Sequence, residues 1–211
     1  MPLEAIADVL YQCKPPLAAI DVSRVHCNSS ALHHRAGALM ASYATHWLGL
    51  TKGFDFDTKL PRKVAGLQVQ QNRDGGVDIF RGKPRIAEYE QLGYWHGHPT
   101  IVEVKAGQLN GYANRLQKHL EIAQRVYARQ DVNALLFIPY ERTAERDLLR
   151  LTDRYSPHLQ TVDLQFTRKE IEDFLTANKD TFGINCKAQK TKTRYKCPLK
   201  RKKRGRRRIR K

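Results

Sequence analysis

The apolar residues of this 211-residue chain recur with two different periods, and each period predicts one kind of secondary structure. Steps of three and four residues mark one face of a helix, whereas alternation or a short apolar run marks a strand. Helices are expected at 3–10, 32–47, 109–129, 143–155 and 168–178. Strands are expected at 64–71, 77–80, 100–105, 132–138 and 159–166. This order predicts an α/β fold in which helices flank a mixed central sheet.

Residues 81–99 interrupt this order as a polar insert between two expected strands. The insert contains cations and flat aromatic rings, among them Arg81, Lys83, Arg85, Tyr94 and Trp95. Cationic and aromatic side chains together suit phosphate contact and base stacking, so these residues are candidate nucleic-acid contacts. A β-hairpin extension packed on the body is the alternative interpretation.

The formal charge of +17 is concentrated at the C-terminus. Residues 187–211 hold 15 Lys or Arg and no acid, so the other residues together carry about +2. Such a segment buries too little apolar surface to fold alone and is expected to be disordered when free. Its cations would neutralise the phosphates of a nucleic acid, with strong salt dependence. Its densest run consists of Arg201, Lys202, Lys203, Arg204, Arg206, Arg207 and Arg208. A nuclear or nucleolar targeting signal, or a solubilising tail, is the alternative interpretation.

The cysteines show neither a metal-binding nor a disulfide pattern. Four are present without a paired Cys-x-x-Cys spacing: Cys13, Cys27, Cys186 and Cys197. Free thiols in a reducing compartment are therefore expected, which places the protein inside the cell with nucleic acid, in the cytoplasm, nucleoid or a eukaryotic nucleus. The N-terminus lacks a secretory signal pattern and no apolar run reaches 18 residues, so no membrane association is expected.

Three charged residues stand inside apolar, strand-like segments, and they are the candidate chemistry of the chain. Asp78 lies in Val-Asp-Ile-Phe, and Glu103 and Lys105 lie in Ile-Val-Glu-Val-Lys. A buried charge needs a partner or a metal. Strand alternation places Glu103 and Lys105 on one side, with Val102 and Val104 facing the opposite core. Two carboxylates can hold Mg²⁺ or Mn²⁺, and a nearby lysine can act on a water, which is the chemistry of phosphodiester hydrolysis.

The order of elements and the placement of these charges resemble the PD-(D/E)XK nuclease superfamily, which includes restriction endonucleases, Holliday-junction resolvases and RecB-like nucleases. The resemblance covers roughly residues 29–138 and implies a restriction-endonuclease-like αβββαβ core. Asp78 matches the acid of the second core strand, and Glu103-Val104-Lys105 matches the (D/E)-X-K of the adjacent third strand. The resemblance implies that Asp78, Glu103 and the Val104 carbonyl hold Mg²⁺, while Lys105 activates the attacking water.

The chain departs from the family pattern in three places. Val77 replaces the proline of the name motif, and the insert 81–99 lengthens the gap between the two motif halves. Many members carry a glutamate on the first core helix, but here residues 28–51 contain no acid. His33 or His34 is a candidate for lining the site in its place, with a surface position as the alternative.

Further candidates lie in the insert and on the following helix. Glu88 or Glu90 could supply a missing metal ligand. Gln117 and Lys118 are expected to support the site or contact the nucleic-acid backbone, and a solvated helix face is the alternative. A structural ion pair between Glu103 and Lys105, or between Asp78 and Lys105, is the alternative for the triad itself.

Together these observations predict three parts: an N-terminal extension at 1–27, a nuclease-like domain at 28–180 and the basic tail at 187–211. The predicted function is metal-dependent DNA endonuclease activity, with RNA not excluded as a substrate. A homodimer would suit double-strand cutting. The alternative is a non-catalytic nucleic-acid-binding protein that acts through its tail.

Overall fold

The computed structural model describes residues 2–20, 32–72, 75–107, 109, 111–142 and 146–178. The basic tail at 187–211 and part of the N-terminal extension lie outside the described residues, as does the side chain of His33. Predictions about those parts of the chain therefore stay predictions.

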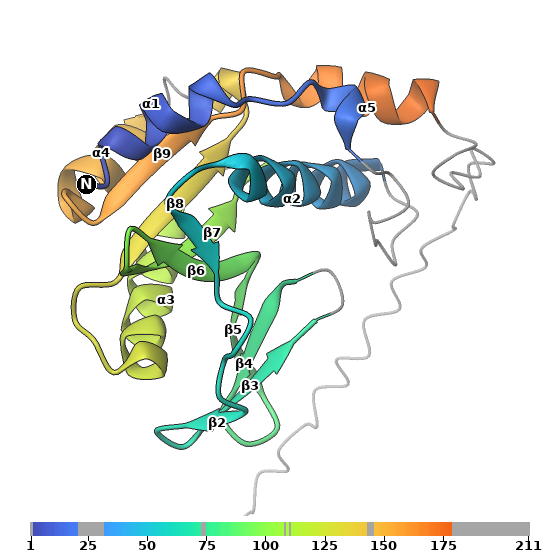
Figure 1. The fold of residues 1–211 in the computed structure, drawn as a ribbon. Coiled ribbons are helices and arrows are strands. Elements are labelled where there is room, and N and C mark those ends of the chain that lie inside the picture. The colour runs from blue at the N-terminus through green and yellow to red at the C-terminus, as the bar shows by residue number, and fades with distance from the viewer. Residues whose placement is uncertain are drawn as a thin grey trace, which may run out of the picture.

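The described chain has an α/β arrangement in which α1 and α2 precede a run of strands, β1 to β7, and helices and strands alternate only from α3 onward (Figure 1). The helices are α1 (Ala5–Gln12), α2 (Leu32–Leu50), α3 (Tyr112–Tyr127), α4 (Arg146–Tyr155) and α5 (Arg168–Ala177), with short 3₁₀ turns η1 (Leu17–Ala19) and η3 (Tyr140–Arg142). The strands are β1 (Phe54–Phe56), β2 (Lys63–Val64), β3 (Leu67–Gln71), β4 (Val77–Phe80), β5 (Arg85–Tyr89), β6 (Gln91–Trp95), β7 (His98–Val104), β8 (Asn133–Ile138) and β9 (Leu159–Asp163).

The strands form two sheets. The five-stranded sheet, called the large sheet, has the order β1-β6-β7-β8-β9 and is mixed, because β7, β8 and β9 are parallel while β1, β6 and β7 are antiparallel. The four-stranded sheet, called the small sheet, is antiparallel with the order β2-β3-β4-β5. The predicted α/β class and mixed sheet are confirmed, and a second sheet is added.

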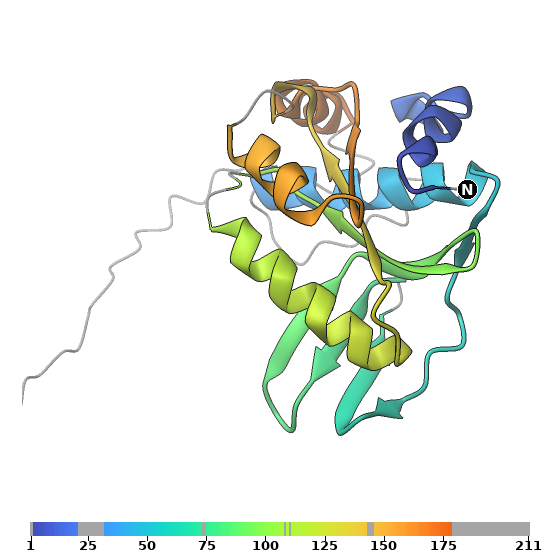
Figure 2. The same ribbon diagram turned by 90° about the vertical axis from the view of Figure 1, so that its left-hand side faces the viewer.

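Two hydrophobic cores lie on opposite faces of the large sheet. On one face α1, α2 and α5 pack against alternate residues of the strands, such as Val102, Leu135 and Val162. On the other face α3, α4 and the inner face of the small sheet pack against the intervening residues, such as Ile101 and Leu136. Figure 2 shows α3 lying in front of the small sheet. The strand β8 is buried along its whole length because both of its faces are covered, as its apolar run predicts.

The strand order before α3 differs from the predicted three strands. In the described chain seven strands precede α3, and the insert 81–99 contributes two of them, β5 and β6. These strands belong to different sheets: β5 pairs with β4, and β6 pairs with β7. The insert is therefore neither a loop nor a separate hairpin, and it links the two sheets.

A bend at Glu90 separates β5 from β6. The side chain of Tyr89 packs toward α3, where its hydroxyl donates to the His119 carbonyl at 2.7 Å. The side chain of Gln91 packs toward α2, where its amide donates to the Thr45 hydroxyl at 3.3 Å. Residues two apart in a straight strand share a face, so the opposite directions of Tyr89 and Gln91 show that the strand turns over at Glu90.

Of the helices in the described segments, none combines the length and the apolar character that a membrane span requires.

Candidate active site

The alternation of β7 places Glu103 and Lys105 on the face of the large sheet that α3 covers. Val102 and Val104 face the opposite way and belong to the core formed with α2. Lys105 follows the last residue of β7, and its ammonium lies 4.9 Å from the centre of the Tyr112 ring at the start of α3. The predicted division of these four residues between two faces is confirmed.

The carboxylate of Glu103 is almost completely buried and has cationic or hydrogen-bonding partners on both oxygens. Its side chain is 3% exposed. The Nδ1 of His119 lies 2.6 Å from Oε1, and the ammonium of Lys105 lies 3.1 Å from Oε2. Glu103, Lys105 and His119 therefore form one polar cluster, called the Glu103 cluster below, between β7 and α3.

Burial and hydrogen bonding act on Glu103 in opposite directions. Burial alone would raise the pKa of its carboxyl, but the hydrogen bond from His119 and the charge of Lys105 outweigh burial and leave the pKa lowered. The carboxyl is therefore ionised at neutral pH and can only accept hydrogen bonds. It follows that the hydrogen of this bond is on Nδ1 of His119, whose N–H donates a hydrogen bond to Glu103.

His119 reaches this position because it lies on the apolar stripe of α3. Buried residues recur along α3 at Tyr112, Leu116, His119, Ala123 and Val126, which are spaced by four, three, four and three. The sequence interpretation chose Gln117 and Lys118 and missed His119. The signal was available, since a histidine at a core position of an amphipathic helix must find a buried partner.

Tyr112 borders the same cluster from the first turn of α3. Burial and the nearby negative charge of Glu103 raise the pKa of its hydroxyl well above the ordinary value. The hydroxyl is buried and interacts with the Glu103 carboxylate, but it makes no hydrogen bond of ordinary geometry within the described part of the chain. A buried hydroxyl without a well-formed hydrogen bond is costly, so this position suits a water or a ligand oxygen that completes the cluster.

Asp78 lies in the small sheet and has its own partners. Its neighbours Val77 and Ile79 point into the core shared with α3, so Asp78 points to the opposite face of the small sheet. There its Oδ1 accepts a hydrogen bond from Arg85 at 2.9 Å and its Oδ2 accepts one from Asn72 at 3.2 Å. The predicted adjacency of the Asp78 strand to the Glu103 strand is thus corrected: β4 and β7 belong to different sheets.

Other predicted contact residues divide between the surface and the core. Arg81 and Lys83 are exposed in the turn between β4 and β5. Trp95 is fully buried, and its Nε1 donates to the Pro2 carbonyl at 3.3 Å, so the structure gives this ring a core role in place of base stacking. Tyr94 is half-buried and its ring packs edge-on against Tyr127.

Three of the remaining candidates are exposed on helices, and the fourth, Arg85, lies in β5. Lys118 and Gln117 are exposed on α3, and Gln117 donates to Glu121 at 3.0 Å. His34 is exposed on the first turn of α2. Arg85 is half exposed and bridges Asp78 and Glu88, at 2.9 and 3.0 Å.

The oxygen donors near Glu103 fit a hard divalent cation in part. The Lys105 N–H donates to the Phe137 carbonyl of β8 at 2.9 Å. The Val104 carbonyl belongs to the same peptide group, so it points away from β8, toward the side of β6. The pairing of β6 with β7 ends at Val102, so Val104 lies past the paired part of β6. A carboxylate and a carbonyl are ligand types that Mg²⁺ takes. However, no group of three or more His, Cys, Asp or Glu within the described segments is placed to hold a metal.

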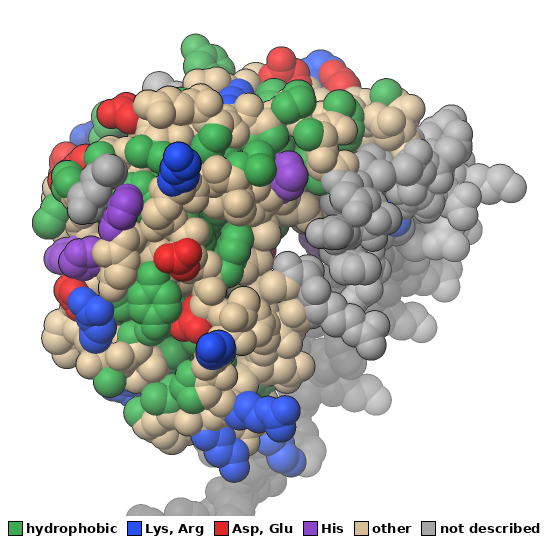
Figure 3. Space-filling view, in the orientation of Figure 1, with side chains coloured by type: hydrophobic (Ala, Val, Ile, Leu, Met, Phe, Trp, Pro, Cys, Tyr) green, Lys and Arg blue, Asp and Glu red, His purple; other side chains and the backbone are tan. Residues whose placement is uncertain are grey.

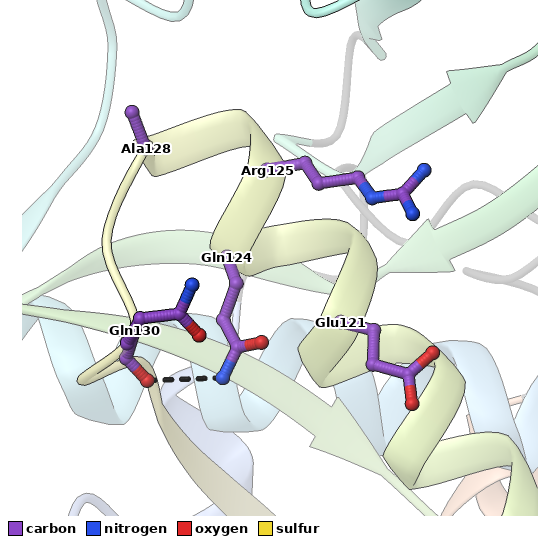
Figure 4. Close-up of a pocket in the computed structure, with 5 residues that line it drawn as sticks. All are labelled: Glu121, Gln124, Arg125, Ala128 and Gln130. Atoms are coloured by element: carbon purple, nitrogen blue, oxygen red, sulfur yellow. Dashed lines mark hydrogen bonds between the residues drawn. The ribbon is translucent and has the colours of Figure 1, made fainter.

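A separate cavity of about 430 Å³ lies at the C-terminal end of α3 (Figure 4). Gln124 closes part of it by donating to the Gln130 carbonyl at 2.9 Å. The cavity shares no lining residue with the Glu103 cluster, so it is not part of the candidate site.

Comparisons with known proteins return no relative. No protein-family model matches the chain, and neither the curated proteins nor the solved structures give a significant match. Function is therefore argued from the chain's own residues.

The pH dependence of stability offers a test of the Glu103 cluster. Because folding lowers the pKa of Glu103, its contribution to stability is complete above the unfolded pKa of about 4.3 and is lost as pH falls through the folded pKa. The melting temperature of the wild type is expected to fall more steeply below about pH 4.3 than that of Glu103→Gln. Thermal melts across this range, with exposed Glu121→Gln as a control that keeps the wild-type slope, measure the difference. Parallel curves for wild type and Glu103→Gln would contradict the assignment.

Proposed function

We propose that this protein is a metal-dependent endonuclease that hydrolyses phosphodiester bonds in DNA, in a mobile-element, restriction or repair role. The observation that carries the proposal is the contact between Glu103 and Lys105 on the α3 face of β7. A buried carboxylate is expensive to desolvate and its pairing with a lysine adds little to stability, so the presence of Glu103 and Lys105 at the end of an apolar strand favours a chemical role. An acid and a lysine two residues apart at the end of a strand also match the (D/E)-X-K motif.

The residues of the cluster would divide the work. Glu103 and the Val104 carbonyl would hold Mg²⁺ or Mn²⁺. Asp78, which the resemblance to PD-(D/E)XK nucleases assigns as the second carboxylate, lies on the outer side of the small sheet with Arg85 and Asn72 and is not part of this cluster. The metal would supply charge neutralisation at the scissile phosphate and a more acidic bound water. Lys105 would orient or deprotonate that water, or stabilise negative charge as it develops.

His119 and Tyr112 support this arrangement from α3. The hydrogen bond from His119 holds the Glu103 carboxylate in one orientation, as residues behind a ligand commonly do. The buried hydroxyl of Tyr112 would donate to a water or a phosphate oxygen. With its ring beside the ammonium, Tyr112 also limits the positions that Lys105 can adopt.

The second candidate function is non-catalytic binding of nucleic acid. The observation that favours it is that both acids already have cationic partners: Asp78 contacts Arg85, and Glu103 contacts Lys105. In this case the two ion pairs are structural, and the basic tail makes the main contact with the polyanion.

A cleavage panel separates the two functions. The full chain is incubated with plasmid, linear duplex, single strand, four-way junction and RNA, each with Mg²⁺, with Mn²⁺ and with EDTA. The nuclease proposal expects cleavage of at least one DNA substrate with metal and none with EDTA, and loss of that cleavage in Glu103→Gln. Salt-sensitive binding to every substrate, with no cleavage in any metal condition, would instead establish the binding protein.

A further inference from the structure

The small sheet has one face that no helix or strand of the described residues covers. Residues of β3 and β4 alternate, with Val69 and Ile79 in the core and Gln68 and Phe80 on the opposite side, called the outer face below. Strand pairing aligns a row across this face, in which Lys63 pairs with Gln68, Gln68 with Phe80, and Phe80 with Arg85. The row therefore places the half-buried ring of Phe80 between the amide of Gln68 and the cation of Arg85, with Lys63 on the far side of Gln68.

A groove of about 610 Å³ runs over this face. It is lined by Thr58, Leu60, Arg62, Lys63, Gln68, Val69, Gln70, Gln71 and Phe80. The lining is mostly polar and contains three amide side chains, one flat ring and two cations. Amides can donate to and accept from the edges of bases, a ring can stack on a base, and cations can neutralise phosphates.

The charges around the groove favour a polyanion. Five exposed cations surround it or lie at the neighbouring turn: Lys59, Arg62, Lys63, Arg81 and Lys83. The two acids of the outer face, Asp78 and Glu88, are both engaged by Arg85. In Figure 3 Lys and Arg side chains gather at the lower end of the molecule, where Figure 1 shows β2 and the β4–β5 turn.

We propose that the outer face of the small sheet binds a single strand of nucleic acid, with Phe80 stacked on a base and Arg62 and Lys63 on the backbone. A single strand fits better than a duplex because stacking on Phe80 and amide contact from Gln68 both need bases whose faces and edges are free. Gln70 lines the groove and pairs with Asp78 across the sheet, so the bound strand passes beside Asp78. This proposal adds the binding surface to the proposed nuclease but does not depend on cleavage.

Binding in EDTA tests the surface without any contribution from cleavage. Fluorescence anisotropy of a labelled single-stranded DNA is measured with the full chain at about 0.5 M salt, where the ionic contribution of the basic tail is small. Phe80→Leu keeps an apolar side chain but removes the ring, and a loss of about tenfold in affinity is expected. Tyr140→Leu, which removes an exposed ring from another surface, is the matched control and keeps wild-type affinity.

Crosslinking and salt dependence give independent readouts. A single strand containing 5-iodouracil is expected to crosslink to Phe80 in the full chain, as identified by mass spectrometry. The pair Arg62→Ser and Lys63→Ser is expected to reduce the slope of log affinity against log salt by about 1.4, whereas Arg150→Ser and Arg154→Ser on α4 leave it unchanged. Wild-type affinity in Phe80→Leu, or tighter binding of a duplex than of a single strand, would overturn the proposal whatever the cleavage panel shows.

Discussion

Replacing Lys105 with alanine is expected to abolish metal-dependent cleavage while leaving the affinity for DNA in EDTA close to that of the wild type. Lys105 is the most exposed residue of the Glu103 cluster. Its side chain is 22% exposed, compared with 3% for Glu103 and 9% for His119. It is therefore the group best placed to meet a water or a phosphate oxygen. Proton transfer or charge stabilisation by one positioned residue contributes about 10²–10⁴ in rate, so cleavage by Lys105→Ala should fall by at least that lower factor.

Two further variants define what Lys105 does. Lys105→Arg keeps a positive charge beside Glu103 but cannot lose a proton at neutral pH. Retained cleavage in this variant would indicate charge stabilisation, and lost cleavage would indicate proton transfer or strict placement. Lys169→Ala removes an exposed lysine from α5 and is the control with wild-type activity. If Lys105→Ala cuts at the wild-type rate, Lys105 has no catalytic role and the proposed centre is wrong.

Replacing His119 with leucine is expected to give the largest loss of stability of any single change in the cluster. The substitution removes the donor to a buried, ionised carboxylate and leaves Oε1 of Glu103 without its partner. Breaking a buried pair by removing one member costs about 3–5 kcal/mol. For a chain of this size, 1 kcal/mol corresponds to about 2–4 °C in melting temperature, so a fall on the order of 10 °C is expected in thermal melts.

A double variant separates the loss of the pair from the loss of packing. In Glu103→Leu with His119→Leu, neither an unpaired carboxylate nor an unpaired imidazole remains, and Lys105 can turn its ammonium to water. The double variant is expected to be more stable than His119→Leu alone, because replacing both partners by apolar groups is often close to neutral. A double variant that is less stable than both single variants would show that His119 acts through packing and not through Glu103.

Much of this fold could be predicted from local patterns. The stripe of α3, the apolar run of β8 and the alternation of Val102, Glu103 and Val104 each record which face of an element is buried, so each was confirmed. These predictions depend only on residues near one another in the chain. The residues that make up the Glu103 cluster are harder to predict from local patterns. His119 lies on a different element from Glu103, and only the packing of α3 on β7 brings them together.

The division of the strands between two sheets could not be predicted in the same way. The residues of β5 and β6 show no clear alternation as one segment, because the strand turns over at Glu90 and its two halves bury opposite faces. A mixed pattern of this kind is typical of a polar insert, and the placement of Asp78 beside Glu103 followed from that interpretation. For Trp95 the surrounding polar residues suggested exposure, but pairing with β7 and the contact with the N-terminal segment bury the ring.

The single residue between β5 and β6 also restricts how this chain can change in length. Because Tyr89 points to α3 and Gln91 to α2, the count of residues at the bend sets the alignment of β5 relative to β6. Adding or removing one residue there would disturb the contact of Tyr89 with α3 or that of Gln91 with α2. Substitutions at Glu90 are thus far easier to accommodate than insertions or deletions, and the bend is a site where spacing constrains the molecule more than residue type.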